Sequence, residues 1–143
     1  MSASVLIADD DPNIVRALRF LMHREGHDVR TVTDGEKALA AIEEMAPDLV
    51  LLDLMMPKGS GYEVCRTLRA NRSYDNVSII MLTAKGREDD QRVGMSLGAD
   101  AYITKPFAIE DVVRCVANVL GRRQTDLAAS RGDKPADALT PRS

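Results

Sequence analysis

The chain has 143 residues, of which 45% are hydrophobic, and its formal net charge is −3 at pH 7. This hydrophobic share excludes a wholly disordered chain, and the length suits one domain with a core of its own. The acidic balance offers no basic footprint for nucleic acid, and no apolar stretch approaches the ~20 residues of a membrane span. Because the chain runs straight into an apolar segment at Val5, we see no secretory signal and expect a cytoplasmic protein.

Short apolar runs alternate with amphipathic stretches along the rest of the chain. The apolar runs predict five buried strands, at residues 5–9, 28–32, 49–53, 77–82 and 101–104. The amphipathic stretches predict five helices, at residues 12–25, 35–45, 61–70, 87–97 and 109–120. This alternation implies a parallel sheet with helices on both faces and right-handed crossovers. We therefore predict an α/β fold with a doubly wound, five-stranded parallel sheet.

Residues at the expected helix boundaries support these assignments. Asp11 followed by Pro12 is typical of an N-cap with proline at the first helical position. Thr33, with Glu36 three residues later, fits a capping box at the start of the second helix. Three glycines stand where left-handed residues commonly end helices, namely Gly26, Gly98 and Gly121.

The composition of the chain changes after Gly121. Residues 122–143 lack aromatic side chains and carry Gly132, Pro135, Pro141 and several alanines and serines. Such a segment has little apolar surface to bury, so we expect it to be a flexible tail. The predicted organisation is one domain over residues 1–121 and a tail over residues 122–143.

Acidic side chains gather where the first and third predicted strands end. Asp9 and Asp10 close the first strand, and Asp53 closes the third. Asp53 alone would also fit a structural cap at a strand end. If the two strands are parallel neighbours, however, these carboxylates meet at one edge, where like charges oppose ionisation. A bound divalent cation would neutralise the cluster, and carboxylates with Mg²⁺ suit phosphoryl transfer.

Two further polar residues follow the fourth and fifth predicted strands, at the edge where doubly wound folds carry their working sites. Thr83 could cap a loop or donate to a phosphoryl oxygen, for which the small Ala84 would leave room. A lone Lys105 would usually be a solvated charge, but beside three acids it becomes a counter-ion and phosphate ligand. Tyr102, in the fifth strand, fits a core residue and an adjustable, half-buried ring equally well.

With these residues in place, the chain resembles the response-regulator receiver domains of two-component signalling. The resemblance covers about residues 4–120 and rests on VLIADDDPNI, DLVLLDLMMPKGSGYEV, IIMLTA, LGADAYITKPF and the order of strands and helices between them. It implies a flavodoxin-like sheet with strand order 2-1-3-4-5 and five helices.

The resemblance also implies a phosphoryl-acceptor site. Asp53 would accept a phosphoryl group from a phosphohistidine on a sensor histidine kinase or phosphotransfer protein. Asp9 and Asp10 would hold Mg²⁺ together with the Asp53 carboxylate and the backbone carbonyl of Met55. Such a domain is a switch rather than an enzyme, and it catalyses its own phosphorylation and dephosphorylation. Met55 and Lys85 would flank the site and tune the lifetime of the phosphoryl group.

The implied switch links the phosphoryl group to a partner-binding face. Lys105 would pair with the phosphoryl group, Thr83 would hydrogen-bond to it, and Tyr102 would change position in response. We also expect a cis peptide between Lys105 and Pro106, which would aim the lysine at the site. The implied output face comprises three segments, residues 87–97, 101–104 and 109–120. The effector stays open, a phosphorylation-dependent dimer is one form of output, and neither nucleic acid nor membrane is an expected partner.

Two other functions share parts of this pattern. A haloacid-dehalogenase-like phosphatase would also use Asp53 as a nucleophile, but it needs a second acid two residues on, where this chain has Met55. A flavodoxin would bind flavin, but the acids after the first strand would repel the cofactor phosphate, and aromatic residues make up only 3% of the chain.

Overall fold

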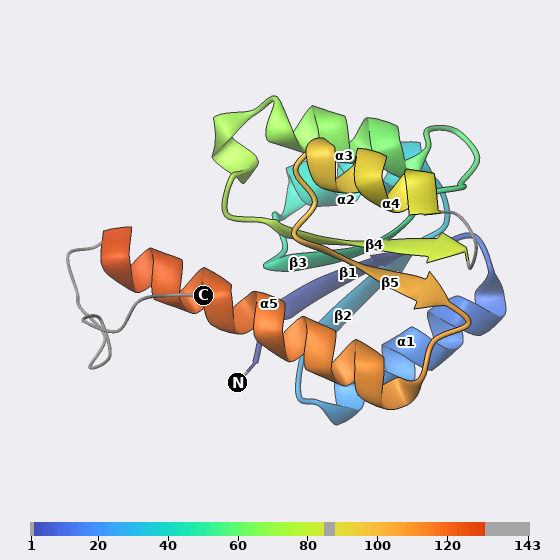
Figure 1. Cartoon of the computed structure of the whole chain (residues 1–143), viewed down its shortest axis with the longest axis horizontal. Coiled ribbons are helices and arrows are strands. Elements are labelled where there is room, and N and C mark those ends of the chain that lie inside the picture. The colour runs from blue at the N-terminus through green and yellow to red at the C-terminus, as the bar shows by residue number, and fades with distance from the viewer. Residues whose placement is uncertain (1, 85–87, 131–143) are drawn as a thin grey trace.

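The structure is a computed structural model that describes the backbone of residues 2–84 and 88–130 and the side chains within residues 2–84 and 92–122 (Figure 1). The expectations for Lys85 and for residues 131–143 of the tail therefore lie outside the described residues. Among the described helices, none is both long enough and apolar enough to cross a membrane.

A five-stranded sheet forms the centre of the fold. Its strands are β1 (Ser4–Ala8), β2 (Asp28–Val32), β3 (Leu49–Asp53), β4 (Ser78–Ala84) and β5 (Ala101–Lys105). The helices are α1 (Pro12–Arg24), α2 (Gly35–Glu44), α3 (Gly61–Arg69), the 3₁₀ turn η1 (Arg72–Tyr74), α4 (Glu88–Ser96) and α5 (Ile109–Ser130). Every neighbouring pair of strands is parallel, and the order is β2-β1-β3-β4-β5. This confirms the predicted fold class and strand order.

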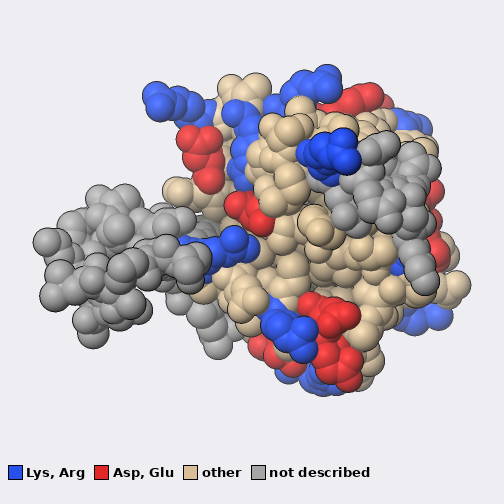
Figure 2. All heavy atoms as spheres, viewed as in Figure 1, with Lys and Arg blue, Asp and Glu red and all other residues tan. Residues whose placement is uncertain are grey.

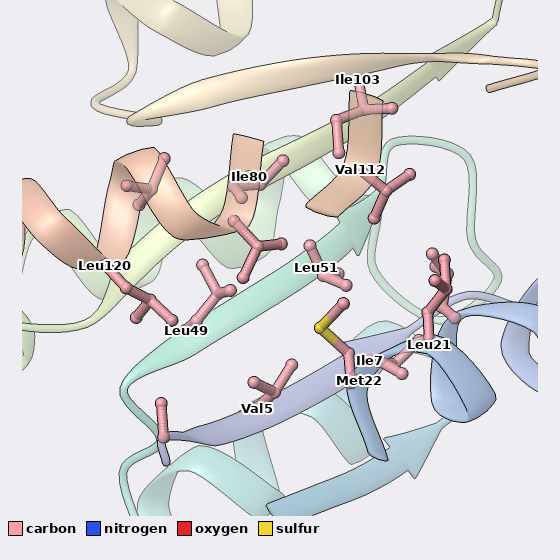
Figure 3. Packing of buried hydrophobic residues seen from close by; sticks show 14 of the residues in the cluster. Val5, Ile7, Leu21, Met22, Leu49, Leu51, Ile80, Ile103, Val112 and Leu120 are labelled. Carbon is pink, nitrogen blue, oxygen red and sulfur yellow. The ribbon is translucent and has the colours of Figure 1, made fainter. Parts of the chain in front are cut away.

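Helices cover both faces of the sheet, with α1 and α5 on one side and α2, α3 and α4 on the other (Figure 1). Side chains alternate between the two faces along each strand, as the period of a strand requires. Val5 and Ile7 of β1 therefore join the core under α1 and α5, whereas Leu6 and Ala8 join the core under α2 and α3. Figure 3 shows the first of these cores, in which side chains of β1 and β3 pack with side chains of α1 and α5. Burial on both faces explains why β1 and β3 are almost wholly apolar.

The bounds of α1, α2, α3 and α4 lie within one residue of the predicted ones, and the N-cap of α2 lies one residue later than predicted. Asp11 caps α1 as predicted, and Gly26 and Gly98 have the positive φ expected of residues that end helices. At α2 the N-cap is Asp34 rather than Thr33, because the Asp34 carboxylate accepts the N–H of Lys37 in the first turn. The Lys105–Pro106 peptide is cis, as predicted.

The prediction for the end of α5 was wrong. The helix was expected to end at residue 120 and instead continues to Ser130, so residues 122–130 are helical where a flexible tail was expected. Gly121 does not have the positive φ of a C-cap. Glycine inside a helix costs only about 1 kcal/mol relative to alanine, which a helix of this length absorbs. Figure 1 shows this part of α5 running beyond the edge of the sheet.

Candidate functional site

The three acids meet at the carboxyl edge of the sheet, meaning the edge where all five strands end. Ala8 of β1 pairs with Leu52 of β3, which places the residue after each, Asp9 and Asp53, side by side. One carboxylate oxygen from each of Asp9, Asp10 and Asp53 lies within 4.8 Å of the other two. Asp9 and Asp53 are buried and Asp10 is exposed, so the cluster has one open side.

Lys105 supplies the positive charge that the structure places against this cluster. Its Nζ lies 2.7 Å from Oδ2 of Asp9 and 3.4 Å from Oδ1 of Asp53. Burial by itself lowers the pKa of Lys105, but the hydrogen bond to Asp9 and the charges of Asp53 and Asp9 outweigh it and raise that pKa. The ammonium is therefore retained at neutral pH, and within the described part of the chain one positive charge faces three carboxylates.

The acid at the centre of the cluster does not ionise easily. Burial raises the pKa of the Asp53 carboxyl to about 6, and the negative charge of Asp9 contributes to the rise. Lys105 opposes this rise, as does the N–H of Met55, which donates to Oδ1 of Asp53 at 3.3 Å. Asp9 has a partner of its own, because Oδ1 accepts the N–H of Asp11 at 2.9 Å. The carboxyl edge thus keeps an excess of negative charge that Lys105 does not balance.

These residues fit a divalent cation. Carboxylate and carbonyl oxygens are the ligands that Mg²⁺ prefers, and one exposed acid leaves room for the waters that this ion keeps. Met55, whose carbonyl the resemblance assigns to the metal, lies two residues past the end of β3, and its N–H donates to Asp53. A cation would also offset the two negative charges that remain after Lys105 is counted.

The two residues expected to form the switch occupy different environments. Thr83 lies on β4, one residue past the pairing of Asp53 with Leu82, and its side chain is almost wholly buried. Tyr102 lies on β5 and is 45% exposed, which excludes the core interpretation and leaves that of an adjustable ring. The structure thus places Thr83 at the carboxyl edge and Tyr102 on the neighbouring outer surface.

Sequence reasoning missed the close backbone packing beneath the acceptor. A Cβ on Gly61, the first residue of α3, would lie 2.4 Å from the carbonyl oxygen of Asp53. Real Cβ atoms essentially never come that close, so Gly61 lets α3 begin directly against the end of β3. The only signal in the sequence was a glycine at the start of a predicted helix, a position where glycine otherwise weakens the helix.

Comparisons with known proteins agree with this geometry. The sequence profile of the family described as Response regulator receiver domain matches residues 5–117. The alkaline phosphatase synthesis transcriptional regulatory protein PhoP of Bacillus subtilis is 41% identical over 97% of this chain and 56% of its own length. The sensory transduction protein RegX3 of Mycobacterium tuberculosis is 44% identical over 86% of this chain and 53% of its own length. The chain thus spans about half the length of the curated relatives it matches.

Solved structures give the same result. A putative response regulator from Chloroflexus aurantiacus superposes with a TM-score of 0.81 and 32% identity, over 85% of this chain and 99% of that protein. NtrX from Brucella abortus superposes with a TM-score of 0.86 and 26% identity, over 92% of this chain and 29% of that one. These similarities favour the receiver interpretation over the phosphatase and flavodoxin alternatives.

Proposed function

The chain belongs to the response regulator receiver family of two-component signalling, and on that premise we propose that Asp53 is its phosphoryl acceptor. The observation that carries this proposal is the convergence of three carboxylates and the Lys105 ammonium at the carboxyl edge. Within that cluster, Asp53 combines a raised pKa with a place at the end of the central strand β3. Such a perturbed acid among charged partners is typical of a functional site.

The proposed reaction is phosphoryl transfer to a carboxylate. An oxygen of ionised Asp53 attacks the donor phosphorus, the bond from phosphorus to the imidazole nitrogen of the donor breaks, and an acyl phosphate forms. With a pKa of about 6, Asp53 is mainly ionised at pH 7 and ready to attack. Lys105 would pair with a phosphoryl oxygen as a compact positive charge. Water later attacks the phosphorus and releases phosphate, which restores Asp53.

Mg²⁺ completes the proposed site. Asp9, Asp10, Asp53 and the backbone carbonyl of Met55 would hold it, as the acidic cluster and its net negative charge support. When bound, the ion offsets the charge on the acids and on the transferring phosphoryl group. Positioning by the domain itself is then sufficient for self-catalysed phosphorylation from small donors such as acetyl phosphate.

We also propose that phosphorylation changes the output face, defined here as the outer surface of α4, β5 and α5. Thr83 would be drawn to the phosphoryl oxygen, and Tyr102 could then turn toward the space that Thr83 leaves. Val93 and Met95 on α4 and Tyr102 on β5 are exposed, as partner-binding surfaces often are. Figure 2 shows a mainly uncharged surface between α4 and α5, with charged side chains around it. We also expect the loop of residues 84–86 to repack when Thr83 moves, and this loop lies largely outside the described residues.

The proposed partners follow from the premise. A sensor histidine kinase or phosphotransfer protein would supply the phosphoryl group in the cytoplasm. Relatives include MtrA of Mycolicibacterium smegmatis, described as a DNA-binding response regulator. For this chain we propose a receiver unit over residues 1–121 that passes its state to an effector or a second copy through the output face, without touching nucleic acid itself.

Labelling tests the acceptor directly. The wild-type protein is incubated with acetyl phosphate and Mg²⁺ and followed by intact mass spectrometry; one added phosphoryl group is expected, and none with EDTA. Asp53→Asn should remain unlabelled, whereas Asp75→Asn, at an exposed acid away from the cluster, should label as the wild type does. Equal labelling of Asp53→Asn would place the chemistry elsewhere.

A further inference from the structure

The loop after the acceptor strand is held at its base. We call residues 54–60, between β3 and α3, the acceptor loop. Its first residue, Leu54, accepts the N–H of Gly61 at 3.0 Å, which closes the loop at its base. The side chains of Leu54 and Met56 are buried, while that of Met55 points into solvent. The loop is therefore short and closed, and it contains the carbonyl proposed to bind the metal.

The tip of the acceptor loop is held by a helix that follows a different strand. The N–H of Gly35 donates to the carbonyl of Pro57 at 3.2 Å, and the N–H of Glu36 donates to that of Lys58 at 2.9 Å. The N–H groups of a first helical turn have no partner inside their own helix. Asp34 caps the next N–H of α2, so the loop tip occupies the donors that this cap leaves.

A contact between two glycines lets the loop tip approach α2 so closely. A Cβ on Gly35 would lie 2.1 Å from the carbonyl oxygen of Gly59, and the obstacle is backbone, which cannot turn aside. The approach also needs left-handed backbone at the tip, with φ of 53° at Lys58 and 112° at Gly59. A left-handed conformation costs roughly 1–2 kcal/mol for a residue with a side chain, so the bonds to α2 hold Lys58 in place.

We propose that the contact between Gly35 and Gly59 makes the start of α2 a positioning element for the metal site. Its N–H groups set the place of the loop tip, and the closed loop passes that position to Met55 and Asp53. The link to Asp53 is direct, because the N–H of Met55 donates to its carboxylate. This inference rests on the proposed function, since it assigns Gly35 a role toward the Mg²⁺ that the acids would hold.

Mg²⁺ makes such positioning consequential. The ion demands near-ideal octahedral geometry with ligands at about 2.0–2.1 Å, so a displaced carbonyl weakens binding directly. Making room for a Cβ at Gly35 requires the loop tip to retreat by roughly 1 Å in a closely packed region. A misplacement of that size can cost about 10²-fold where geometry governs the chemistry.

The first experiment compares Gly35→Ala with Gly121→Ala. In α5, a Cβ on Gly121 would meet no atom within 4 Å, so that variant tests alanine in a helix without a clash. We expect Gly35→Ala to bind Mg²⁺ at least tenfold more weakly by calorimetry, and Gly121→Ala to match the wild type. Amide NMR spectra without Mg²⁺ check that both variants are folded. A folded Gly35→Ala that binds Mg²⁺ like the wild type would overturn the proposal.

A second pair decides the matter if Gly35→Ala does not fold. Glu36→Pro replaces the N–H that donates to Lys58 with a ring carbon, so the bond is lost and the loop tip is pushed away from α2. Proline is tolerated in the first helical turn, and Glu36→Ala is the reference for the lost side chain. Mg²⁺ affinity should be several-fold weaker in Glu36→Pro than in Glu36→Ala, and equal affinities would overturn the proposal. A wild-type protein that binds no Mg²⁺ would instead count against the proposed function.

Discussion

Carboxylates lie at both edges of the sheet, and the two groups of acids differ in the partners that meet their negative charge. At the amino edge, where the strands begin, Asp48 accepts the N–H of Ser4 at 2.8 Å. Asp100 accepts the N–H of Ile79 at 2.8 Å and pairs with Arg69 at 3.1 Å. These acids join neighbouring strands through hydrogen bonds within the protein. At the carboxyl edge, Asp9, Asp10 and Asp53 crowd together, and among the described residues Lys105 is the lysine that pairs with them.

The difference separates a structural acid from a reactive one. An acid whose charge is met by backbone N–H groups and an arginine stabilises the fold and needs nothing from outside. An acid that is buried beside other acids holds its charge at a cost. The pKa of Asp53 reports that cost, because burial first and then the charge of Asp9 raise it. The unbalanced edge is where an external cation and a phosphoryl group have something to stabilise.

The largest expected effect comes from removing an acid at the carboxyl edge. Asp10→Asn should lower Mg²⁺ affinity by about 100-fold and slow labelling of Asp53 in parallel, because one charged ligand is lost. Since Asp10 is exposed, the fold should be unaffected. Calorimetry and labelling time courses measure the two effects, and an unchanged affinity would remove Asp10 from the site.

Removing the acceptor should stabilise the metal-free fold. The pKa of Asp53 is raised to about 6 from 3.8, so the folded state binds this proton more tightly than the unfolded state does. The stability that protonated Asp53 contributes is complete below pH 3.8 and is lost as pH rises through about 6. At pH 7 in EDTA, Asp53→Asn should therefore unfold with a free energy about 2 kcal/mol higher than the wild type. Urea denaturation at several pH values measures this difference in the free energy of unfolding. If the difference between the two proteins did not shrink below pH 4, the raised pKa of Asp53 would not be its cause.

An acid at the amino edge should behave in the opposite way. Asp100→Asn weakens the ion pair with Arg69 and the charged acceptor for Ile79, so the free energy of unfolding should fall by about 1–2 kcal/mol. Mg²⁺ affinity should stay at the wild-type value, because the change lies at the far edge of the sheet. If Mg²⁺ affinity fell with stability, the separation of the two edges would not hold.

The smallest expected effect concerns His27, also at the amino edge. Its Nδ1 accepts the N–H of Ala3 at 3.1 Å, and burial lowers its pKa. A lowered pKa contributes stability that is present above the ordinary histidine pKa of 6.5 and is lost as pH falls through the pKa of the folded state. His27→Ala should remove this pH dependence and also the hydrogen bond from Ala3, whose loss costs about 0.5–1 kcal/mol. Denaturation curves between pH 5 and 7.5 test this, and equal slopes for both proteins would contradict it.

Much of this comparison could be predicted from the sequence, and the reasons are physical. The bounds of β3 coincide with the predicted ones, because a strand covered on both faces is a continuous apolar run. The bounds of β2 also coincide, although this edge strand is polar at three positions and only partly buried. The convergence of Asp9, Asp10 and Asp53 followed from treating two predicted strands as parallel neighbours. The phosphate-binding roles of Thr83 and Lys105 followed from their places at the same edge, whereas the movement of Tyr102 depended on the family resemblance. These roles remain proposals.

Other features depended on contacts that no local pattern encodes. The bond from Ser4 to Asp48 joins residues 44 apart, and that from Ile79 to Asp100 joins residues 21 apart. The docking of the acceptor loop on α2 requires a left-handed Lys58, a conformation that sequence rules assign to glycine. The extension of α5 through Gly121 was missed because glycine suggested a helix end.

The most direct test of the central claim is amide NMR with Mg²⁺ and beryllofluoride, in which BeF₃⁻ stands in for the phosphoryl group. We expect large changes in amide chemical shift at the carboxyl edge, around Asp9, Asp53 and Thr83, and smaller changes on the output face. The amides of Ser4 and Ile79, whose acids are already satisfied, should stay in place. Shifts spread evenly over both edges, or no shifts at the carboxyl edge, would contradict the account.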